Sequence, residues 1–229
     1  MNDDVVILIP AYNPTIDLIE LIRSLKENLY SHIVVVDDGS CMSSKNIFDN
    51  ISSYCVIIHH EKNCGKGVAL KTGFQYILQN YHNVSTIITV DADGQHLVSD
   101  INKVKDIAVI SPNNLILGCR NFNKAKVPFR NKFGNTFMSL IFNLIYKLNI
   151  PDTQTGLRAI PIQFINELLS VKGSRYEYEQ NMLIYFAQNF KSSISCVNIT
   201  AVYNKIQVSH FKVFQDSSYI VKCLFQKND

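Results

Sequence analysis

The sequence predicts an α/β fold, with a mostly parallel central sheet and helices on both of its faces. Short runs of Val, Ile and Leu alternate along the chain with longer segments whose apolar residues recur at helical spacing. Acidic pairs directly follow two of these runs, Asp37 and Asp38 after one and Asp91 and Asp93 after another. Because the carboxyl ends of parallel strands share the ligand-binding edge of such a sheet, we expect both pairs to line one crevice.

Composition limits the class of protein. The 229 residues suit a single domain, and 47% hydrophobic with 18% charged residues indicates a globular chain. A net charge of +3 is too small to indicate nucleic acid, and we expect no such partner. The six cysteines form no Cys-x-x-Cys pair, and the sequence shows neither a secretory leader nor an apolar run of membrane-spanning length. These features predict a cytoplasmic protein with reduced thiols.

The first half of the chain alternates between expected strands and helices. Residues 5–9 and 33–36 are continuous apolar runs, as expected for strands that are buried on both faces. Pro10 and Pro14 bracket the turn after the first strand, and apolar residues at helical spacing then predict a helix over 16–25. The other elements expected here are a short helix, a strand at 55–58, a helix that is opened by 63–67 and runs to about 80, a strand at 86–90, a helix at 97–110 and a strand at 115–117.

The second half is less regular. A strongly apolar segment at 137–148 predicts a helix that is too short to cross a bilayer. The polar stretch 152–158 is expected to be a loop between two apolar helices, and a further helix opens at 175–179. A strand at 194–202 and a terminal helix at 217–225 complete the expected order.

Asp91 and Asp93 are the main candidates for chemistry. They end a buried strand with two carboxylates one residue apart, and Gln95 adds an amide oxygen. Hard oxygen donors with room for water suit Mg²⁺ or Mn²⁺, a cation that is usually shared with substrate phosphates. The alternative is that the two aspartates cap the next helix, because Asp is a favoured N-cap residue.

Two further motifs have both a functional and a purely structural interpretation. Asp37 or Asp38 is placed to accept hydrogen bonds from a base or a ribose, although Asp-Asp-Gly-Ser also suits a simple turn. Lys66 lies between Gly65 and Gly67 at a helix start, where it could hold an anion. The spacing of a Walker loop is absent, and an ordinary helix entry explains the glycines as well.

The window from 118 to 150 carries only basic charges, and these are Arg120, Lys124, Lys126, Arg130, Lys132 and Lys147. Beside a short apolar helix they suit an anionic membrane surface, and the alternative is a core helix flanked by solvated lysines. The loop that contains Asp152 and Arg158 is either a substrate loop or a plain connection. His210 is a candidate phosphate contact, although a lone histidine is more often structural.

Taken together, these motifs resemble glycosyltransferase family 2, which has the GT-A fold, and within it the polyprenyl-phosphate sugar synthases. The matching stretches are Ile9 to Asn13, Val36 to Ser40, Asn63 to Gly67, Asp91 to His96, Gly118 to Arg120 and Asp152 to Arg158. The resemblance covers nearly the whole chain. Two departures are Pro14, where the family usually has an acidic residue, and the end at Asp229, where many relatives continue into membrane helices.

The resemblance implies that residues 1–118 bind the nucleotide sugar and residues 119–229 the acceptor. It implies that Pro10, Tyr12 and Asp38 hold the base and ribose, that Asp91 and Asp93 form the family's Asp-x-Asp pair with Gln95 at the metal, and that Arg120 and Arg130 face the donor diphosphate and the acceptor phosphate. With the residues identified above, the candidate site comprises four sets. The nucleotide sugar is expected to contact Pro10, Tyr12, Asp37, Asp38, Lys66, Asp91, Ala92 and Asp93, and the acceptor Arg120, Arg130, Arg158 and His210. The expected catalytic residues are Asp91, Asp93, Arg120 and Asp152. The expected ligands of Mg²⁺ or Mn²⁺ are Asp91, Asp93 and Gln95.

The implied reaction is a direct displacement that inverts the anomeric carbon of a nucleoside-diphosphate sugar. A divalent cation with an Arg or Lys would stabilise the leaving diphosphate. A polyprenyl phosphate, the expected acceptor, is already ionised, whereas a glycan hydroxyl would need a base, for which Asp152, Glu177 and Glu179 are candidates. A lipid acceptor predicts a peripheral protein at the inner face of the membrane, alone or with a separate membrane protein.

Three other functions fit less of the sequence. A nucleotidyltransferase would carry a Gly-rich loop after the first strand, where residues 10–14 contain no glycine. Asp37 and Asp38 would also suit a receiver-type signalling domain, but such a domain would account for only about half of the 229 residues. A non-catalytic sugar-nucleotide binder would share nearly all of the motifs, so only turnover distinguishes it.

Overall fold

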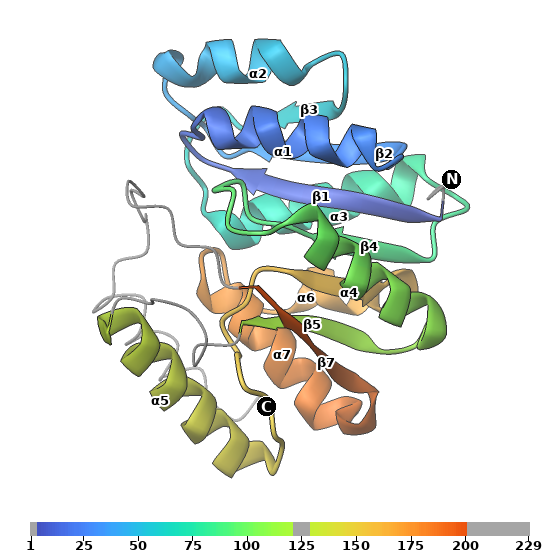
Figure 1. The fold of residues 1–229 in the computed structure, drawn as a ribbon, viewed down its shortest axis with the longest axis vertical. Coiled ribbons are helices and arrows are strands. Elements are labelled where there is room, and N and C mark those ends of the chain that lie inside the picture. Colours follow the sequence, from blue (N-terminus) through green and yellow to red (C-terminus); the bar gives the residue numbers. More distant parts are fainter. Residues whose placement is uncertain (1–3, 121–128, 201–229) are drawn as a thin grey trace.

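A seven-stranded sheet forms the centre of the molecule (Figure 1). The computed structural model describes residues 4–120 and 129–200, without the side chains of 129–134. Its strands are β1 (Val5–Ala11), β2 (His32–Asp37), β3 (Val56–His59), β4 (Thr86–Thr89), β5 (Leu115–Arg120), β6 (Arg158–Pro161) and β7 (Ile194–Ile199). Its α-helices are α1 (Ile16–Glu27), α2 (Lys45–Ile51), α3 (Lys66–Asn80), α4 (Val98–Ile110), α5 (Phe129–Tyr146), α6 (Ile165–Ser170) and α7 (Glu177–Asn189).

The strand order β3-β2-β1-β4-β6-β5-β7 is parallel except at β6, which confirms the expected mostly parallel sheet. β6 runs antiparallel to both β4 and β5, so β4 and β5 point the same way. As a result, β1, β2, β4 and β5 all end at one edge of the sheet, and β6 begins there. Polar residues at those strand ends are therefore brought together.

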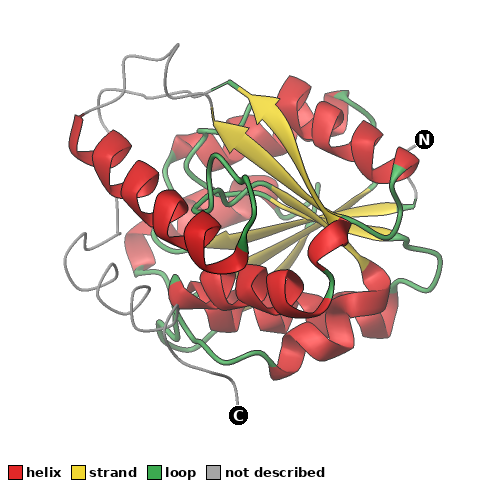
Figure 2. Cartoon of the chain, turned by 90° about the horizontal axis from the view of Figure 1, so that it is seen from below, coloured by secondary structure: helices red, strands yellow, loops and turns green. Residues whose placement is uncertain are grey.

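Each face of the sheet buries its own apolar layer, because successive side chains of a strand point to opposite faces. Val6 and Leu8 of β1 pack into the layer formed with α3, α5, α6 and α7. Val5, Ile7 and Ile9 pack into the layer formed with α1, α2 and α4. Figure 2 shows these helices on both sides of the strands, as the sequence predicts.

Most expected elements of the first 110 residues are confirmed to within two residues. The prediction that 152–158 is a loop between two helices is wrong at its end, because Arg158 is the first residue of the strand β6. This strand has only four residues and ends at Pro161, so it is too short to show the alternation of apolar and polar residues that predicts a strand. The apolar helix also starts earlier than expected, at Phe129, and the expected terminal helix at 217–225 lies outside the described residues.

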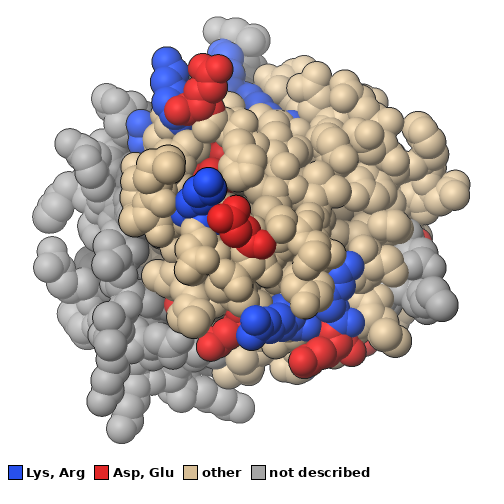
Figure 3. Space-filling model, turned by 90° about the horizontal axis from the view of Figure 1, so that it is seen from above, with Lys and Arg blue, Asp and Glu red and all other residues tan. Residues whose placement is uncertain are grey.

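The helices in the described ranges are all too short or too polar to cross a bilayer. At the end of the molecule where α2 lies, Figure 3 shows basic and acidic side chains next to one another. This face therefore presents charges of both signs rather than a basic field.

Candidate active site

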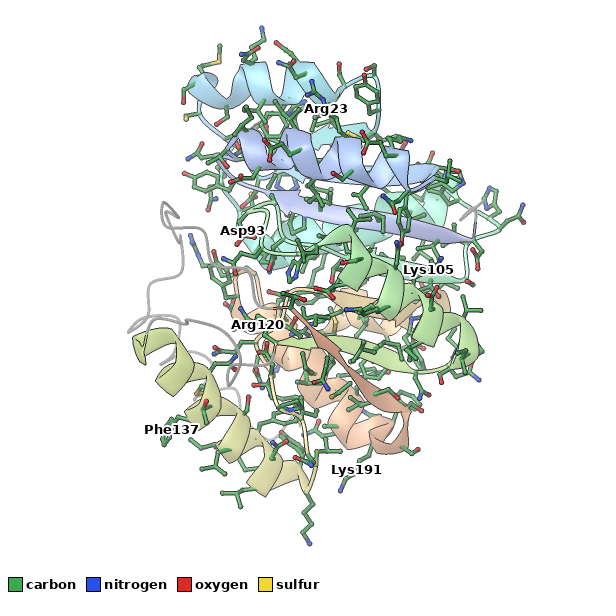
Figure 4. All side chains as sticks on the ribbon, in the orientation of Figure 1. Arg23, Asp93, Lys105, Arg120, Phe137 and Lys191 are labelled. Carbon is green, nitrogen blue, oxygen red and sulfur yellow. The ribbon has the colours of Figure 1, made fainter. Side chains whose placement is uncertain are left out.

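The candidate site lies at the edge where the strands end. Tyr12 follows β1, the acidic stretch 91–93 follows β4, and Arg120 is the last residue of β5. Figure 4 labels Asp93 and Arg120, which lie at this same edge although they are 27 positions apart in the sequence. The edge thus gathers carboxylates and cations from separate parts of the chain.

Asp91 is held by a network of charges. The Lys66 ammonium at the start of α3 lies 2.6 Å from Asp91 Oδ1 and 2.7 Å from Glu179 Oε2 on α7. His96 Nε2 lies 3.4 Å from Asp91 Oδ2, which is long for a hydrogen bond. Burial by itself would raise the pKa of Asp91, but Lys66 and His96 together hold that pKa well below its usual range. The carboxylate is therefore ionised and already paired with a cation.

Gly156 explains how the 152–158 segment approaches this carboxylate. A Cβ atom at Gly156 would overlap the carboxyl group of Asp91, so only glycine allows the backbone to lie this close. The carbonyl of Gly156 also accepts a hydrogen bond from Thr89 Oγ1 at 2.8 Å. The segment therefore packs directly against the acidic pair.

Asp93 lies in a tight turn after Asp91. Its Oδ1 accepts the backbone N–H of Gln95 at 3.1 Å, and Gly94 in between has a positive φ of 71°. Burial and then the nearby charge of Asp91 raise the pKa of Asp93. Two carboxylates that repel each other this way are stabilised by a cation between them.

A divalent cation of the Mg²⁺ or Mn²⁺ type fits this donor set. The ammonium of Lys66 already occupies a position between two carboxylates, which shows that the cluster accommodates positive charge. Asp91 and Asp93 supply hard oxygen ligands, and Gln95 follows in the same turn. We expect these three residues to hold the metal.

Lys66→Met is expected to lower the free energy of unfolding by about 2–4 kcal/mol, because it leaves Asp91 and Glu179 without their shared cation. We place the value below that of a fully buried pair because the Asp91 side chain is 29% exposed. Added Mn²⁺ should restore part of the loss, since it supplies a replacement cation. Urea unfolding with and without Mn²⁺ measures both effects.

Lys71→Met on the same helix is the matched control, because its ammonium donates to the carbonyl of Val171 at 2.6 Å. It should change the unfolding free energy much less than Lys66→Met and should not alter the response to Mn²⁺. An equal gain from Mn²⁺ in wild type and in Lys66→Met would contradict the shared-cation interpretation.

Asp37 and Asp38 point in different directions, as consecutive residues at a strand end do. Asp37 Oδ1 accepts the Ser40 N–H at 2.9 Å, Asp37 Oδ2 lies 2.8 Å from His59 Nδ1, and a cavity of about 260 Å³ opens beside it toward α2. Asp38 is 3% exposed and faces the loop before α3. The two carboxylates therefore belong to different surroundings.

Asp38 ties that loop to the sheet. Its oxygens accept the backbone N–H groups of Cys64 and Gly65 at 2.9 and 2.8 Å and the side-chain amide of Asn63 at 3.0 Å. His60 Nδ1 lies 2.8 Å from the same carboxylate. In this arrangement Asp38 positions the loop that carries Lys66, and direct contact of its carboxylate with a nucleotide remains a prediction.

The remaining candidates from the first half surround the turn after β1. Pro10 is buried in β1 opposite Val36, whereas Tyr12 is 38% exposed at the edge. Asn13 joins the neighbouring turn, because its N–H donates to Ser40 Oγ at 2.8 Å and its Oδ1 accepts the Cys41 N–H at 2.8 Å. Ala92, between the two aspartates, is half-buried. Tyr12 is thus the best placed of these side chains to meet a ligand.

Arg120 and Asp152 form a second charged centre. Arg120 Nε and Nη2 donate to the two oxygens of Asp152 at 2.7 and 3.2 Å. Asp152 is fully buried, and it also accepts the amide of Asn135 at 2.7 Å and the N–H of Gln154 at 3.1 Å. Burial would raise the pKa of Asp152, but Arg120 and Asn135 outweigh it and lower that pKa. A carboxylate engaged in this way fixes Arg120 and is poorly placed to act as a base.

Arg158 departs from the expected acceptor role. Its side chain is 1% exposed, and its guanidinium donates to the carbonyl oxygens of Thr155 and Glu179 at 2.9 and 2.6 Å. These contacts join β6 to α7 inside the protein, so Arg158 has a structural role here. Two other acceptor candidates are not described, His210 as a whole and Arg130 in its side chain.

The structure adds residues that the motifs did not assign. The sequence predicts Glu179 only as a candidate base, yet its side chain is 11% exposed and paired with Lys66. Its Oε1 is buried without a hydrogen-bond partner among the described residues. The sequence places His96 in a motif but predicts no role for it. Asn135 precedes the apolar segment 137–148, and nothing in the local sequence indicates that its amide contacts Asp152.

The comparisons with known proteins agree with this geometry. Residues 6–169 match the family Glycosyl transferase family 2. An uncharacterised protein of Methanocaldococcus jannaschii is 29% identical, over 99% of this chain and 93% of its own. The UDP-N-acetylglucosamine–dolichyl-phosphate N-acetylglucosaminyltransferase of Methanococcus voltae is also 29% identical, over 91% of this chain and 92% of its own.

Solved structures support the fold. The UDP complex of glucosyl-3-phosphoglycerate synthase from Mycobacterium tuberculosis superposes with a TM-score of 0.71 at 14% identity, covering 96% of this chain and 78% of that one. A second complex of that synthase, with Mn²⁺, UDP and its product, gives a TM-score of 0.68 at 15% identity, with the same two coverages. The family match spans well over half of the chain, and the sheet with its acidic edge has the GT-A arrangement. The chain belongs to glycosyl transferase family 2 and is a glycosyltransferase of GT-A fold.

Proposed function

We propose that this glycosyltransferase inverts the anomeric carbon of a nucleoside-diphosphate sugar and uses a polyprenyl phosphate as acceptor, with a divalent cation at Asp91 and Asp93. The M. voltae relative, whose name specifies a dolichyl-phosphate acceptor and which aligns over 91% of this chain, supports the choice. When bound, the cation would offset the negative charge that develops on the leaving diphosphate.

The choice of a phosphate acceptor rests on one observation: the three carboxylates that could serve as a base are all engaged in ion pairs or hydrogen bonds. Asp152 is bound by Arg120, Glu179 by Lys66, and Glu177 Oε1 accepts the N–H groups of Ser174 and Arg175 at 2.9 and 3.1 Å. A hydroxyl acceptor would need one of them to be released to take a proton. A phosphate acceptor is already ionised and needs no base, which fits a site whose carboxylates are engaged.

Arg120 supplies the matching positive charge. Its side chain is 19% exposed, at the edge shared with Asp93, and Asp152 fixes the direction of its guanidinium. Held charges of this kind stabilise phosphate without reorganising during the reaction. In this proposal Arg120 orients the acceptor phosphate, while Lys66 stands beside the donor site.

α5 offers a surface for the lipid part of such an acceptor. Its apolar side chains Phe137, Leu140, Leu144 and Ile145 are 40–71% exposed and recur at helical spacing along one side of the helix. Phe137 points away from the sheet in Figure 4. An exposed apolar face of this kind, in a stretch of sequence (118–150) that carries only basic charges, is suited to lie in the plane of a membrane surface. We therefore infer peripheral contact with the cytoplasmic leaflet.

The function is tested by supplying UDP- and GDP-sugars to the protein with vesicles that contain a polyprenyl phosphate, or with soluble glycans instead. We expect nucleotide release and a glycolipid product only with the lipid phosphate, and NMR of that product should show the inverted anomer. Nucleotide release with soluble glycans and without the lipid phosphate would show that the acceptor is a sugar hydroxyl instead. Absence of release in every mixture would indicate a non-catalytic nucleotide binder.

Leu140→Glu combined with Leu144→Glu is expected to weaken vesicle binding about tenfold or more. Both Leu side chains are exposed in the free protein, and the substitutions remove the apolar surface that they would bury in the membrane interface. Transfer to a long-chain polyprenyl phosphate should fall in parallel, whereas transfer to a short water-soluble prenyl phosphate should be retained. Vesicle sedimentation and product assays measure the two effects.

Val109→Glu with Ile110→Glu is the control, since these apolar residues on α4 are also exposed, at 61% and 75%. The control should bind vesicles as wild type does. Equal loss of binding in both double variants would mean that α5 has no special part in membrane contact.

A further inference from the structure

Three side chains with different metal-ligating atoms converge at the loop before α3. A carboxylate oxygen of Asp38, a ring nitrogen of His60 and the sulfur of Cys64 all lie within 4.8 Å of one another. These residues follow β2, follow β3 and precede α3, respectively, and none of them belongs to the Asp91–Asp93 pair. A mixed O, N and S donor set is typical of Zn²⁺ or Co²⁺, whereas Mg²⁺ prefers oxygen alone.

The backbone holds these three groups in place. Asp38 accepts the N–H groups of Cys64 and Gly65 at 2.9 and 2.8 Å, which fixes the loop that carries the thiol over the carboxylate. The ligand atoms of a tetrahedral zinc site lie about 3.4–3.6 Å apart, given its usual bond lengths. In the resting cluster the His60 Nδ1 to Asp38 Oδ1 distance is 2.8 Å and the widest spacing is within 4.8 Å, so small side-chain movements produce the required geometry.

His60 also has the outer partner that a metal-bound imidazole needs. Its Nε2 lies 3.0 Å from Thr72 Oγ1 on α3, a hydroxyl that can either donate or accept. Because a carboxylate can only accept, a neutral His60 without a metal would carry its proton on Nδ1 and accept from Thr72 at Nε2. With a metal at Nδ1, the proton resides on Nε2 and is donated to Thr72, as metal-binding histidines usually do with their second nitrogen.

We propose that Asp38, His60 and Cys64 form a second metal site, selective for Zn²⁺-class cations over Mg²⁺. On binding, the Cys64 thiol loses its proton to solvent and the thiolate, the Nδ1 of His60 and a carboxylate oxygen of Asp38 ligate the ion. The consequence for the enzyme rests on the proposed function. Because the same loop continues into Lys66, and Asp38 is a predicted nucleotide contact, a loaded site opposes donor binding.

Cobalt absorption tests the site without any assay of sugar transfer. Co²⁺ is added to the reduced protein in a phosphine reductant, with excess Mg²⁺ present to fill oxygen-only sites. We expect one equivalent of Co²⁺ to give a thiolate-to-cobalt charge-transfer band and tetrahedral ligand-field bands, and Zn²⁺ to displace them. Absence of a thiolate band in wild type under these conditions, with Mg²⁺ in excess, would overturn the proposal.

Variants assign the ligands. Cys64→Ser should lose the charge-transfer band, and serine can replace the thiol in its 3.3 Å hydrogen bond to the carbonyl of Lys62, so the fold is retained. Thr72→Val should keep the band but weaken Co²⁺ affinity about tenfold or more, as the loss of an outer partner does. Circular dichroism of the metal-free variants checks folding.

Cys41→Ser is the matched thiol control. Cys41 is exposed, and its hydrogen bond with Ser43 lowers the pKa of its thiol, so it is a natural site for adventitious thiolate binding. The band should be unchanged in Cys41→Ser. A band that survives in Cys64→Ser and disappears in Cys41→Ser would refute the site, whereas failure of the proposed sugar transfer would leave the cobalt result unaffected.

Discussion

Asp93→Asn is expected to reduce sugar transfer on the order of 10²- to 10³-fold while the metal-free protein unfolds at an unchanged or slightly higher urea concentration. The loss follows because one of the two carboxylates proposed to hold the cation at the leaving diphosphate is removed. The stability follows because burial and the charge of Asp91 already raise the pKa of Asp93, so its ionised form is unfavourable in the fold without a cation. Turnover and urea unfolding in chelator measure the two effects.

Asp17→Asn is the matched control for this substitution. Asp17 lies in the first turn of α1, and its Cβ atom is 3.0 Å from where a Cβ of Gly94 would be, so the same charge is removed next to the same turn. Its turnover should stay within a few-fold of wild type. If Asp93→Asn kept its turnover, or lost turnover and stability together, the carboxylate would not be holding a catalytic cation.

Local pattern was enough to predict the acidic edge. The apolar run before Asp91 and the one before Asp37 are each strand-length and flanked by helical spacing, so strand ends could be located from the sequence. The rule that parallel strands end at a common edge then brought the two acidic pairs together. These inferences depend on periodicity, which is a property of neighbouring residues.

Pairings between distant segments could not be predicted in this way. Lys66 and Glu179 meet only because α3 and α7 cover the same face, and nothing near either residue encodes that contact. The burial of Arg158 could not be predicted either, because a polar loop and a short buried strand have similar local sequences until the neighbouring strands are known. The reversal at β6 is decided by its neighbours β4 and β5 and not by its own four residues.

The role of Asp152 illustrates the same limit. A carboxylate in a polar loop was a reasonable candidate base, since exposure and partners cannot be read from the sequence. In the structure it is completely buried and accepts from Arg120, Asn135 and Gln154. Its chemistry is therefore that of a positioning residue that holds Arg120.

Asp152→Asn is accordingly expected to lower the free energy of unfolding by about 3–5 kcal/mol at neutral pH, because it leaves the Arg120 guanidinium without its charged partner. The pKa of Asp152 is lowered in the fold, so its contribution is fully present above the ordinary carboxyl pKa of about 4 and is lost only as pH falls through the lower folded value. The difference between wild type and variant should thus be the same at pH 7 and pH 5 and shrink in stronger acid, as urea unfolding at each pH will show.

A double-variant cycle with Arg120→Gln separates this ion pair from general damage to the loop. If the pair accounts for the loss, the two substitutions together should cost clearly less than the sum of the single ones, since each removes the same interaction. Asp106→Asn serves as the control, because its side chain is 66% exposed beside Lys105 and should change stability by less than about 1 kcal/mol. Strict additivity of Asp152→Asn and Arg120→Gln, or a pH-independent difference that persists in strong acid, would show that Asp152 stabilises the fold without acting through Arg120.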